Sequence, residues 1–379
     1  MKYKIKLTTL TRVHVGNGNF LTKDMDFVVN NRKVYIIDMK AIAREIGDKP
    51  SEFALWAENP NSFLRNFLRN HDISNYALRS LPLCGASFEP INGRVPTLKE
   101  LIHDGRGIAY IPGSSIKGAI RTAILNCYLE EADLDVLNRI NSSNAREIAN
   151  ITQNIEHRVL GGDPNHDIMR FLRVGDAYFG GRCEEVVLQI NLNQRQNRNL
   201  SDRSKSQIVE VLSANSVAEL NVQMGVTHGY KASAENRIFD EVTILEDATE
   251  LFDIGALFDT LNKYLQSKLR KELAAIGRLR NNAQAADGQE YLDGIHQILG
   301  IIRSCSERQC VLRLGQGIGW EFTTGGWSRE KRNAFNQYIV PASRPRNNNY
   351  EGYDFPKSRR IVSGNNPLLG FVKLELVEN

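Results

Sequence analysis

Two basic side chains, Lys117 and Arg121, lie one helical turn apart in a stretch suited to binding an anion. The stretch reads YIPGSSIKGAIRTAILNCY from Tyr110 to Tyr128, and its Pro-Gly-Ser-Ser turn offers two hydroxyls as helix N-caps. No acid occurs between Asp104 and Glu130. Because a helix N-terminus attracts anions through its free N–H groups and its dipole, the pattern predicts a phosphate site here.

The same residues are also typical of an ordinary amphipathic helix. Basic residues on the polar face of such a helix are usually only solvated. The stretch is not a nucleotide P-loop, because that motif requires Gly-Lys-Ser/Thr and the order here is Lys117-Gly118-Ala119. Taken alone, the stretch leaves an anion site and an ordinary strand–turn–helix equally open.

A second candidate region runs from Gly315 to Trp327 and reads GQGIGWEFTTGGW, with five glycines and two tryptophans. Bare glycine backbone lets phosphates or another chain approach closely, and Trp320 and Trp327 offer faces on which bases can stack. The alternative is a glycine-rich hairpin that packs against its own tryptophans. A third basic stretch, PKSRR from Pro356 to Arg360, lies in a region without acids.

The sequence contains little that indicates catalysis. His14 is the only histidine at a motif position, where it could act as the general acid or base of a metal-independent ribonuclease, but it has no evident partner. The sequence therefore predicts no catalytic residue, no metal site and no cofactor, with a ribonuclease using His14 as the alternative. Three histidine–aspartate pairs lack the further ligands of a metal phosphohydrolase and are interpreted as chance: His71-Asp72, His103-Asp104 and His166-Asp167.

The composition is that of an ordinary globular protein with a mildly basic charge. The chain has 379 residues, 41% hydrophobic and 24% charged, with a formal net charge of +4. Its five cysteines form no C-x-x-C pair, and no signal peptide precedes them, which predicts free thiols in a reducing cytoplasm. No apolar run approaches the roughly 18 residues that a membrane span requires.

The elements that must position these residues follow from hydrophobic periodicity. Residues 2 to 9 alternate as a half-buried strand, and FVVNNRKVYII predicts a hairpin that turns at Asn30-Asn31. Asp38 is a candidate N-cap for the helix that follows. Further helices are expected over 53–58, 62–70, 116–127, 248–276 and 291–302, and further strands over 171–178, 186–192, 217–226, 310–314 and 370–377. This irregular mixture predicts an α+β fold.

A polar segment, NQRQNRNLSDRSKS from Asn193 to Ser206, is the predicted linker between two domains. The expected domains are residues 1–192 and 193–379. The second contains a helical insertion at about 248–302 and the glycine-rich segment.

Three groups of motifs occur in one order. VHVGNG comes first, IPGSSIKGAIRTAIL second, and LRLGQGIGW with FPKSRRIV and PLLGFVKLEL last. With this order the chain resembles the RAMP superfamily of CRISPR effector proteins, and it is most similar to the terminal RAMP subunit of type III-A Csm complexes. The resemblance spans both halves of the chain, although the helical inserts match nothing specific.

The resemblance implies two ferredoxin-like, RRM-related modules with helical and loop insertions. It also implies a cytoplasmic, non-catalytic subunit that binds CRISPR RNA near its 3′ end, caps the backbone filament and supports trimming of that end by other nucleases. The implied partners are CRISPR RNA and neighbouring Csm subunits; a pure assembly subunit that contacts only protein is a further alternative.

The predicted RNA-binding residues lie in the three motif regions. They are His14, Gly16 and Gly18; Gly113, Ser114, Ser115, Lys117 and Arg121; Gly315, Gly317, Gly319, Trp320, Gly325, Gly326 and Trp327; and Lys357, Arg359 and Arg360.

Overall fold

A computed structural model shows two β-sheets with helices packed around them, which confirms the predicted α+β class. The structure describes all residues except 48, 90–95, 130–134, 138–139, 141–143, 163–166, 194–200, 226–252, 278–285, 331–334, 344–355, 357, 364–365 and 378–379. The ferredoxin-like character of the modules stays a prediction.

The first sheet joins strands from the two ends of the chain. β1 (Lys2–Thr9) lies between β15 (Phe371–Leu376) and β12 (Val217–Met224), antiparallel to both. Its inward side chains Ile5 and Leu7 are fully buried, as the alternation of β1 predicts. The strand order is β13 (Gln309–Arg313), β15 (Phe371–Leu376), β1 (Lys2–Thr9), β12 (Val217–Met224), β9 (Ala177–Phe179) and β7 (Tyr110–Ile111), with β8 (Leu172–Val174) paired to β12.

The second sheet is mixed, because β10 (Glu184–Asn193) is parallel to β5 (Ala77–Cys84) and β11 (Ser201–Leu212) is parallel to β6 (Leu98–Leu101). Its strand order is β2 (Gly16–Leu21), β6 (Leu98–Leu101), β11 (Ser201–Leu212), β10 (Glu184–Asn193), β5 (Ala77–Cys84), β4 (Lys33–Ile37) and β3 (Phe27–Asn30), with β14 (Ser358–Val362) paired to β10.

The predicted boundary at residue 192 does not separate the two sheets. β10 and β11 pair antiparallel across it, and both sheets contain strands from each side of it. The linker expected over 193–206 was wrong in part, because residues from Ser201 onward belong to β11, while 194–200 lie outside the described residues. Polar composition suggested a loop, but backbone pairing of Ser201 and Asp202 with β10 makes the later part a strand.

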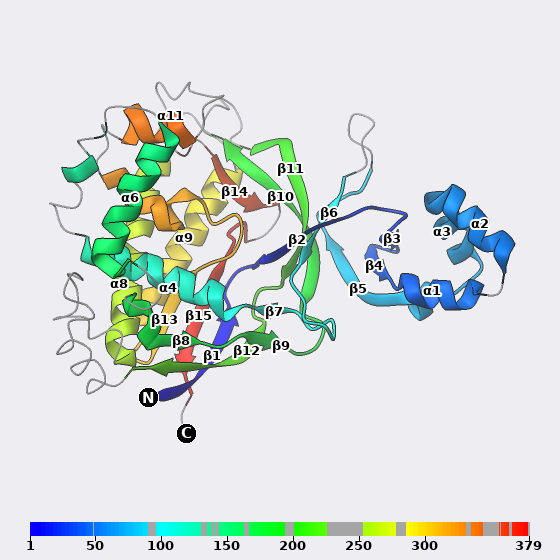
Figure 1. Ribbon diagram of the computed structural model, residues 1–379, viewed down its shortest axis with the longest axis horizontal. Coiled ribbons are helices and arrows are strands. Elements are labelled where there is room, and N and C mark those ends of the chain that lie inside the picture. The colour runs from blue at the N-terminus through cyan, green and yellow to red at the C-terminus, as the bar shows by residue number, and fades with distance from the viewer. Residues whose placement is uncertain are drawn as a thin grey trace.

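Helices form two groups at opposite ends of the molecule (Figure 1). One group comprises α4 (Gly113–Tyr128), α6 (Ala145–Leu160), α8 (Ile254–Gly277) and α9 (Ala286–Ser304), and its apolar faces share cores with the first sheet. The other comprises α1 (Met39–Ile46), α2 (Pro50–Glu58) and α3 (Pro60–Arg69), of which α1 and α3 pack on the β3–β4 hairpin. α8 and α9 confirm the helices predicted within 248–302.

The predicted N-cap of α1 is confirmed, and the predicted hairpin turn lies one residue later than expected. The Asp38 side chain accepts hydrogen bonds from the N–H groups of Lys40 and Ala41, as expected of an N-cap. The β3–β4 hairpin turns at Asn31 and Arg32, which both have positive φ, one residue later than predicted.

Short helical segments complete the described chain. They are η1 (Ile73–Tyr76), η3 (Ile168–Phe171), η6 (Trp320–Phe322), η7 (Thr324–Glu330), η8 (Phe335–Ile339) and α11 (Val340–Ser343). Among the helices that the structure describes, none combines the length and the hydropathy that crossing a bilayer demands.

Candidate functional site

A cleft of about 480 Å³ brings together segments that are far apart in the sequence. Its walls come from residues 15–16, from the first half of α4, and from the glycine-rich segment after β13. The lining residues are Val15, Gly16, Ser115, Gly118, Ala119, Thr122, Arg313, Leu314, Gly315, Gln316, Ile318, Phe322, Thr323 and Thr324. Three regions that the sequence predicts to bind RNA thus form one concave surface.

The N-terminus of α4 is already hydrogen-bonded within the protein. The backbone N–H of Gly113 donates to the Asp176 carboxylate at 2.7 Å, and the N-cap is Pro112, which has no capping side chain. The prediction that Ser114 or Ser115 caps this helix was therefore wrong, since both lie inside its first turn. Because Asp176 already meets one free N–H of this terminus, the terminus is not an open anion site of the kind predicted.

The two basic residues of α4 have different surroundings. Arg121 lies 3.3 Å from the Glu156 carboxylate and 4.0 Å from that of Asp167, although the sequence shows no acid near it. For Lys117, burial lowers the pKa, with an opposing effect from Asp167 and a further lowering by Arg173. Among the described residues, no carboxylate lies within ion-pair distance of Lys117. Lys117 is therefore the better candidate to bind a phosphate.

The sequence predicted that the glycines let a ligand approach closely. At several of these glycines, it is the protein's own backbone that lies close. A Cβ on Gly315 would lie 2.5 Å from the carbonyl oxygen of His14, and one on Gly326 would lie 2.7 Å from that of Glu321. Gly319 has positive φ and no atom within 4 Å of such a Cβ. Gly315 and Gly326 therefore serve chain packing, whereas Gly319 leaves room for a ligand.

The stacking role predicted for Trp327 was wrong, because its side chain is 0% exposed and lies in the main core. Trp320 is half-buried and packs against the same core. The alternative interpretation of this segment, glycines packed with their own tryptophans, describes Trp327 better, although the segment forms η6 and η7 rather than a hairpin.

Arg359 also differs from its predicted role. It is 6% exposed, and its guanidinium forms a two-bond ion pair with Glu272 of α8, which also accepts a hydrogen bond from Tyr291 at 2.7 Å. Arg359 therefore joins β14 to α8 and is not available to RNA. Arg360, its neighbour on β14, is partly exposed, and Lys357 lies outside the described residues.

His14 is buried, with 1% of its surface exposed. Its Nδ1 donates to the backbone carbonyl of Glu210 at 2.6 Å, and a Cβ on Gly16 would lie 2.9 Å from its Nε2. Gly18, in contrast, has open space around it. His14 and Gly16 therefore anchor the segment that lines the cleft.

Because His14 can be protonated, the stability of the segment that it anchors depends on pH. Burial lowers the pKa of His14 below its usual value of about 6.5. A neutral buried histidine binds its proton less readily in the folded state than in the unfolded state, so its contribution to stability is complete above about pH 6.5 and is lost as pH falls toward the folded-state pKa.

We expect the free energy of unfolding to fall between pH 6.5 and pH 5, with His14 contributing up to about 1.4 kcal/mol per pH unit. In His14→Asn, whose amide can still donate to the Glu210 carbonyl, this slope should be shallower. Urea unfolding at several pH values measures it. If the free energy of unfolding changes equally with pH in the wild type and in His14→Asn, then His14 is not the source of this pH dependence.

Sequence reasoning missed Phe20 and Lys99, which adjoin a second pocket of about 310 Å³ on the other sheet. Phe20 on β2 is 58% exposed, and the Lys99 ammonium lies 5.5 Å from the centroid of its ring. Burial, followed by the charge of Arg360, lowers the pKa of Lys99. The only signal in the sequence was an aromatic residue two positions after the last glycine of VHVGNG.

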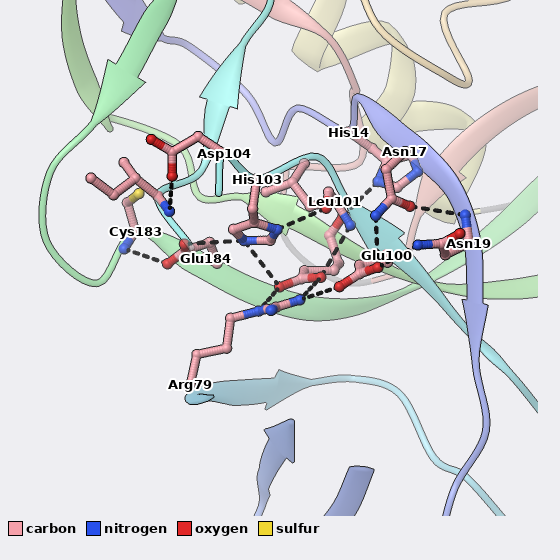
Figure 2. Close-up of polar contacts among 12 residues, drawn as sticks. His14, Asn17, Asn19, Arg79, Glu100, Leu101, His103, Asp104, Cys183 and Glu184 are labelled. Atoms are coloured by element: carbon pink, nitrogen blue, oxygen red, sulfur yellow. Dashed lines mark hydrogen bonds and ion pairs between the residues drawn. The ribbon is translucent and has the colours of Figure 1, made fainter. Parts of the chain in front are cut away.

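A buried polar cluster surrounds the carboxylate of Glu210, which is 0% exposed. Arg79 donates to both Glu210 oxygens, at 2.9 and 3.1 Å, and to Glu100 at 2.9 Å. Figure 2 shows Arg79, Glu100, His103 and Glu184 converging from separate strands and loops. No local motif identified this cluster, because its members come from distant parts of the chain.

The comparisons with known proteins agree with the motif order. Residues 6–281 match the model of the RAMP superfamily. "CRISPR system Cms protein Csm5" of Streptococcus thermophilus is 30% identical over 33% of this chain and 38% of its own length. The protein of the same name from Enterococcus italicus is 25% identical over 32% of this chain and 42% of its own length. The chain thus aligns with about two fifths of these curated relatives.

Two solved structures share the fold over almost the whole chain. A chain of a "Csm-crRNA-target RNA ternary complex" matches with a TM-score of 0.69 and 20% identity, covering 99% of this chain and 100% of that one. The crystal structure of T. onnurineus Csm5 matches with a TM-score of 0.64 and 19% identity, covering 97% and 99%.

Proposed function

The chain belongs to the RAMP superfamily, and from this premise we propose that it is a non-catalytic RNA-binding subunit of a type III-A CRISPR effector complex. It binds CRISPR RNA near the 3′ end, caps the filament of backbone subunits and supports maturation of that end by trimming nucleases, in the cytoplasm. Two relatives named Csm5, and a fold shared with a chain of a Csm–crRNA complex, support this proposal.

The observation that carries the proposal is the cleft, because three motif regions from distant parts of the chain form its walls. Ser115 and Gly118 expose one face of α4, and Lys117 lies beside them. On the opposite wall, Gln316 and Thr323 carry exposed polar side chains that can take part in hydrogen bonds. Such a surface suits a ribose–phosphate chain held through its backbone.

Phe20 and Lys99 extend this surface on the second sheet. An exposed aromatic ring can stack a base, and a lysine beside it can pair with the adjoining phosphate. Arg360 adds positive charge near Lys99. We therefore include these three residues among the RNA contacts, and exclude Arg359 and Trp327 because they are buried.

A structural role, rather than cleavage, is supported by the burial of His14. A general acid or base must reach the proton that it transfers, but His14 is 1% exposed and its Nδ1 is taken up by the Glu210 carbonyl. Labelled repeat RNA incubated with the protein in EDTA is expected to stay intact. Discrete cleavage that is lost in His14→Ala would instead favour the metal-independent ribonuclease.

We expect Lys117→Ala and Lys99→Ala each to weaken the binding of single-stranded CRISPR RNA. Each removes one phosphate contact, so the log–log slope of affinity against salt should flatten by about 0.7 per variant. Fluorescence anisotropy at several salt concentrations measures both quantities. Lys263→Ala, at an exposed lysine of α8 paired with Asp259, is the matched control and should leave the slope unchanged.

Two results would contradict this account in different ways. If Lys117→Ala and Lys99→Ala keep the wild-type slope while the protein still binds RNA, then these lysines are not the contacts. If the wild-type protein has no measurable affinity for RNA at low salt yet still joins the complex, then it is an assembly subunit that contacts only protein.

A further inference from the structure

The walls of the cleft carry little charge. Among the residues that line it, only Arg313 has a charged side chain. Arg313 is 6% exposed, and its guanidinium carbon lies 4.5 and 4.7 Å from the ring centroids of Phe322 and Phe371. Its Nε donates to the Leu369 carbonyl at 3.1 Å. The other polar side chains of the walls are hydroxyls and the amide of Gln316, so the cleft suits an uncharged part of a nucleotide.

Two threonines of these walls form a chain of hydroxyl groups. The Thr122 hydroxyl donates to the Gly118 carbonyl, one turn earlier in α4, at 2.9 Å, and its oxygen lies 3.3 Å from that of Thr324. A hydroxyl has a single hydrogen, and the hydrogen of Thr122 is already bonded to Gly118. Thr324 is therefore the donor to Thr122, and its own oxygen has lone pairs but no hydrogen left to give.

The hydroxyl of Thr323 is in the same state. It donates to the Trp320 carbonyl at 2.7 Å, at the end of η6. Thr323 is exposed, Thr324 is half-buried, and both line the cleft. Within the part of the chain that the structure describes, no group donates to either hydroxyl oxygen. This wall thus presents two neighbouring oxygens that can accept hydrogen bonds but cannot donate them.

Two such acceptors determine which chemical group can bind against them. The oxygens of a phosphate diester also only accept, so they cannot form hydrogen bonds with these hydroxyls. The ribose of RNA has a 2′-hydroxyl that can donate, whereas deoxyribose has only hydrogen at this position. Base N–H groups can donate as well, but their positions differ from base to base. The ribose hydroxyl is present in every nucleotide of RNA, whatever its sequence.

We propose that Thr323 and Thr324 accept hydrogen bonds from ribose 2′-hydroxyls, and that the cleft thereby selects RNA over DNA. This inference rests on the proposed function and identifies the part of the RNA that this wall holds. Lys117, beside the cleft, attracts the phosphates of RNA and of DNA alike, because their charges are the same. The two threonines supply the discrimination between the two sugars.

The test compares three single strands of one sequence: RNA, DNA, and RNA with 2′-fluoro groups in place of the 2′-hydroxyls. Fluorine preserves an RNA-like sugar but cannot donate a hydrogen bond. The full chain is expected to bind RNA at least about fivefold more tightly than either other strand, which corresponds to about one net hydrogen bond. Fluorescence anisotropy measures the three affinities. Their dependence on salt should be the same, because the phosphates are unchanged.

Variants of the two threonines test the assignment of the acceptors. Thr323→Val and Thr324→Val keep the shape of the side chain, and each should lower the affinity for RNA about threefold or more. The affinity for DNA should not change, which also shows that the variants are folded. Thr323→Ser and Thr324→Ser keep the hydroxyl and should keep the preference for RNA. Thr152→Val is the matched control, because the Thr152 hydroxyl bonds to carbonyls of its own helix, α6.

Each contrary result has a separate meaning. Equal affinity of the wild-type chain for RNA and for 2′-fluoro RNA would overturn the inference, and this comparison needs no variant. An undiminished preference for RNA in both valine variants would also overturn it. Binding of RNA with no preference over DNA removes this inference and leaves the proposed function standing. If the chain binds neither nucleic acid, the proposed function fails, and the inference fails with it.

Discussion

Gly113→Ala is expected to destabilise the protein by about 3 kcal/mol or more, which is a large effect for one added methyl group. A Cβ at Gly113 would lie 2.1 Å from the carbonyl oxygen of Val174 and 2.8 Å from the carbonyl of Gly175. Both atoms belong to backbone at the end of β8, which pairs with β12 and has little freedom to move. The new methyl group must therefore displace the start of α4.

Gly118→Ala, five residues later in α4, is the matched control. A Cβ there has no atom within 4 Å, and the site is exposed in the middle of the helix. Alanine should stabilise the helix by up to about 1 kcal/mol, because it has the higher helix propensity. Urea unfolding measures both variants. If the free energy of unfolding changes similarly in Gly113→Ala and Gly118→Ala, then the close contact at Gly113 is relaxed in solution.

Glu272→Ala is expected to destabilise the protein by about 3–5 kcal/mol, because it removes the carboxylate that neutralises the buried guanidinium of Arg359. Burial by itself raises the pKa of Glu272, but the charge of Arg359 and the hydrogen bonds from Arg359 and Tyr291 lower it below its usual value. The carboxylate is therefore ionised. Its contribution is present above about pH 4.5 and is lost as pH falls through the lower folded-state pKa.

Two controls make this prediction specific. Asp259→Ala breaks the exposed pair with Lys263 on the same helix and should leave stability nearly unchanged. Replacing Glu272 and Arg359 together with Met should recover part of the loss, since the guanidinium of Arg359 is then removed together with its carboxylate and only the buried Arg313 still loses the charge of Glu272. If Arg359→Ala instead weakened RNA binding without lowering stability, the buried pair would not be the main role of Arg359.

Much of the local structure followed from sequence patterns. The alternation of Ile5 and Leu7 predicted β1, and Asp38 predicted the start of α1, because each pattern depends only on near neighbours in the chain. The buried face of α4, including Ile116 and Ile120, was also predicted correctly. The order of the motifs was sufficient to indicate the family.

The polar partners were not predictable in this way. Arg121 was expected to be free to bind phosphate because no acid is close to it in the sequence, yet Glu156 lies 35 positions later and forms its ion pair. Glu272 and Arg359, 87 positions apart, form a buried pair for the same reason. Long-range ion pairs depend on how the fold packs helices against one another and against strands, which periodicity does not encode.

By itself, the sequence determined the elements, the buried faces and the family of this protein. Only the tertiary structure decided which basic and aromatic residues remain accessible. It also decided that residues 15–16, α4 and the glycine-rich segment meet in one cleft, and that His103 faces Glu184 and Glu210. The physical reason is that side-chain type is a local property, whereas burial and charge pairing depend on contacts between segments distant in the chain.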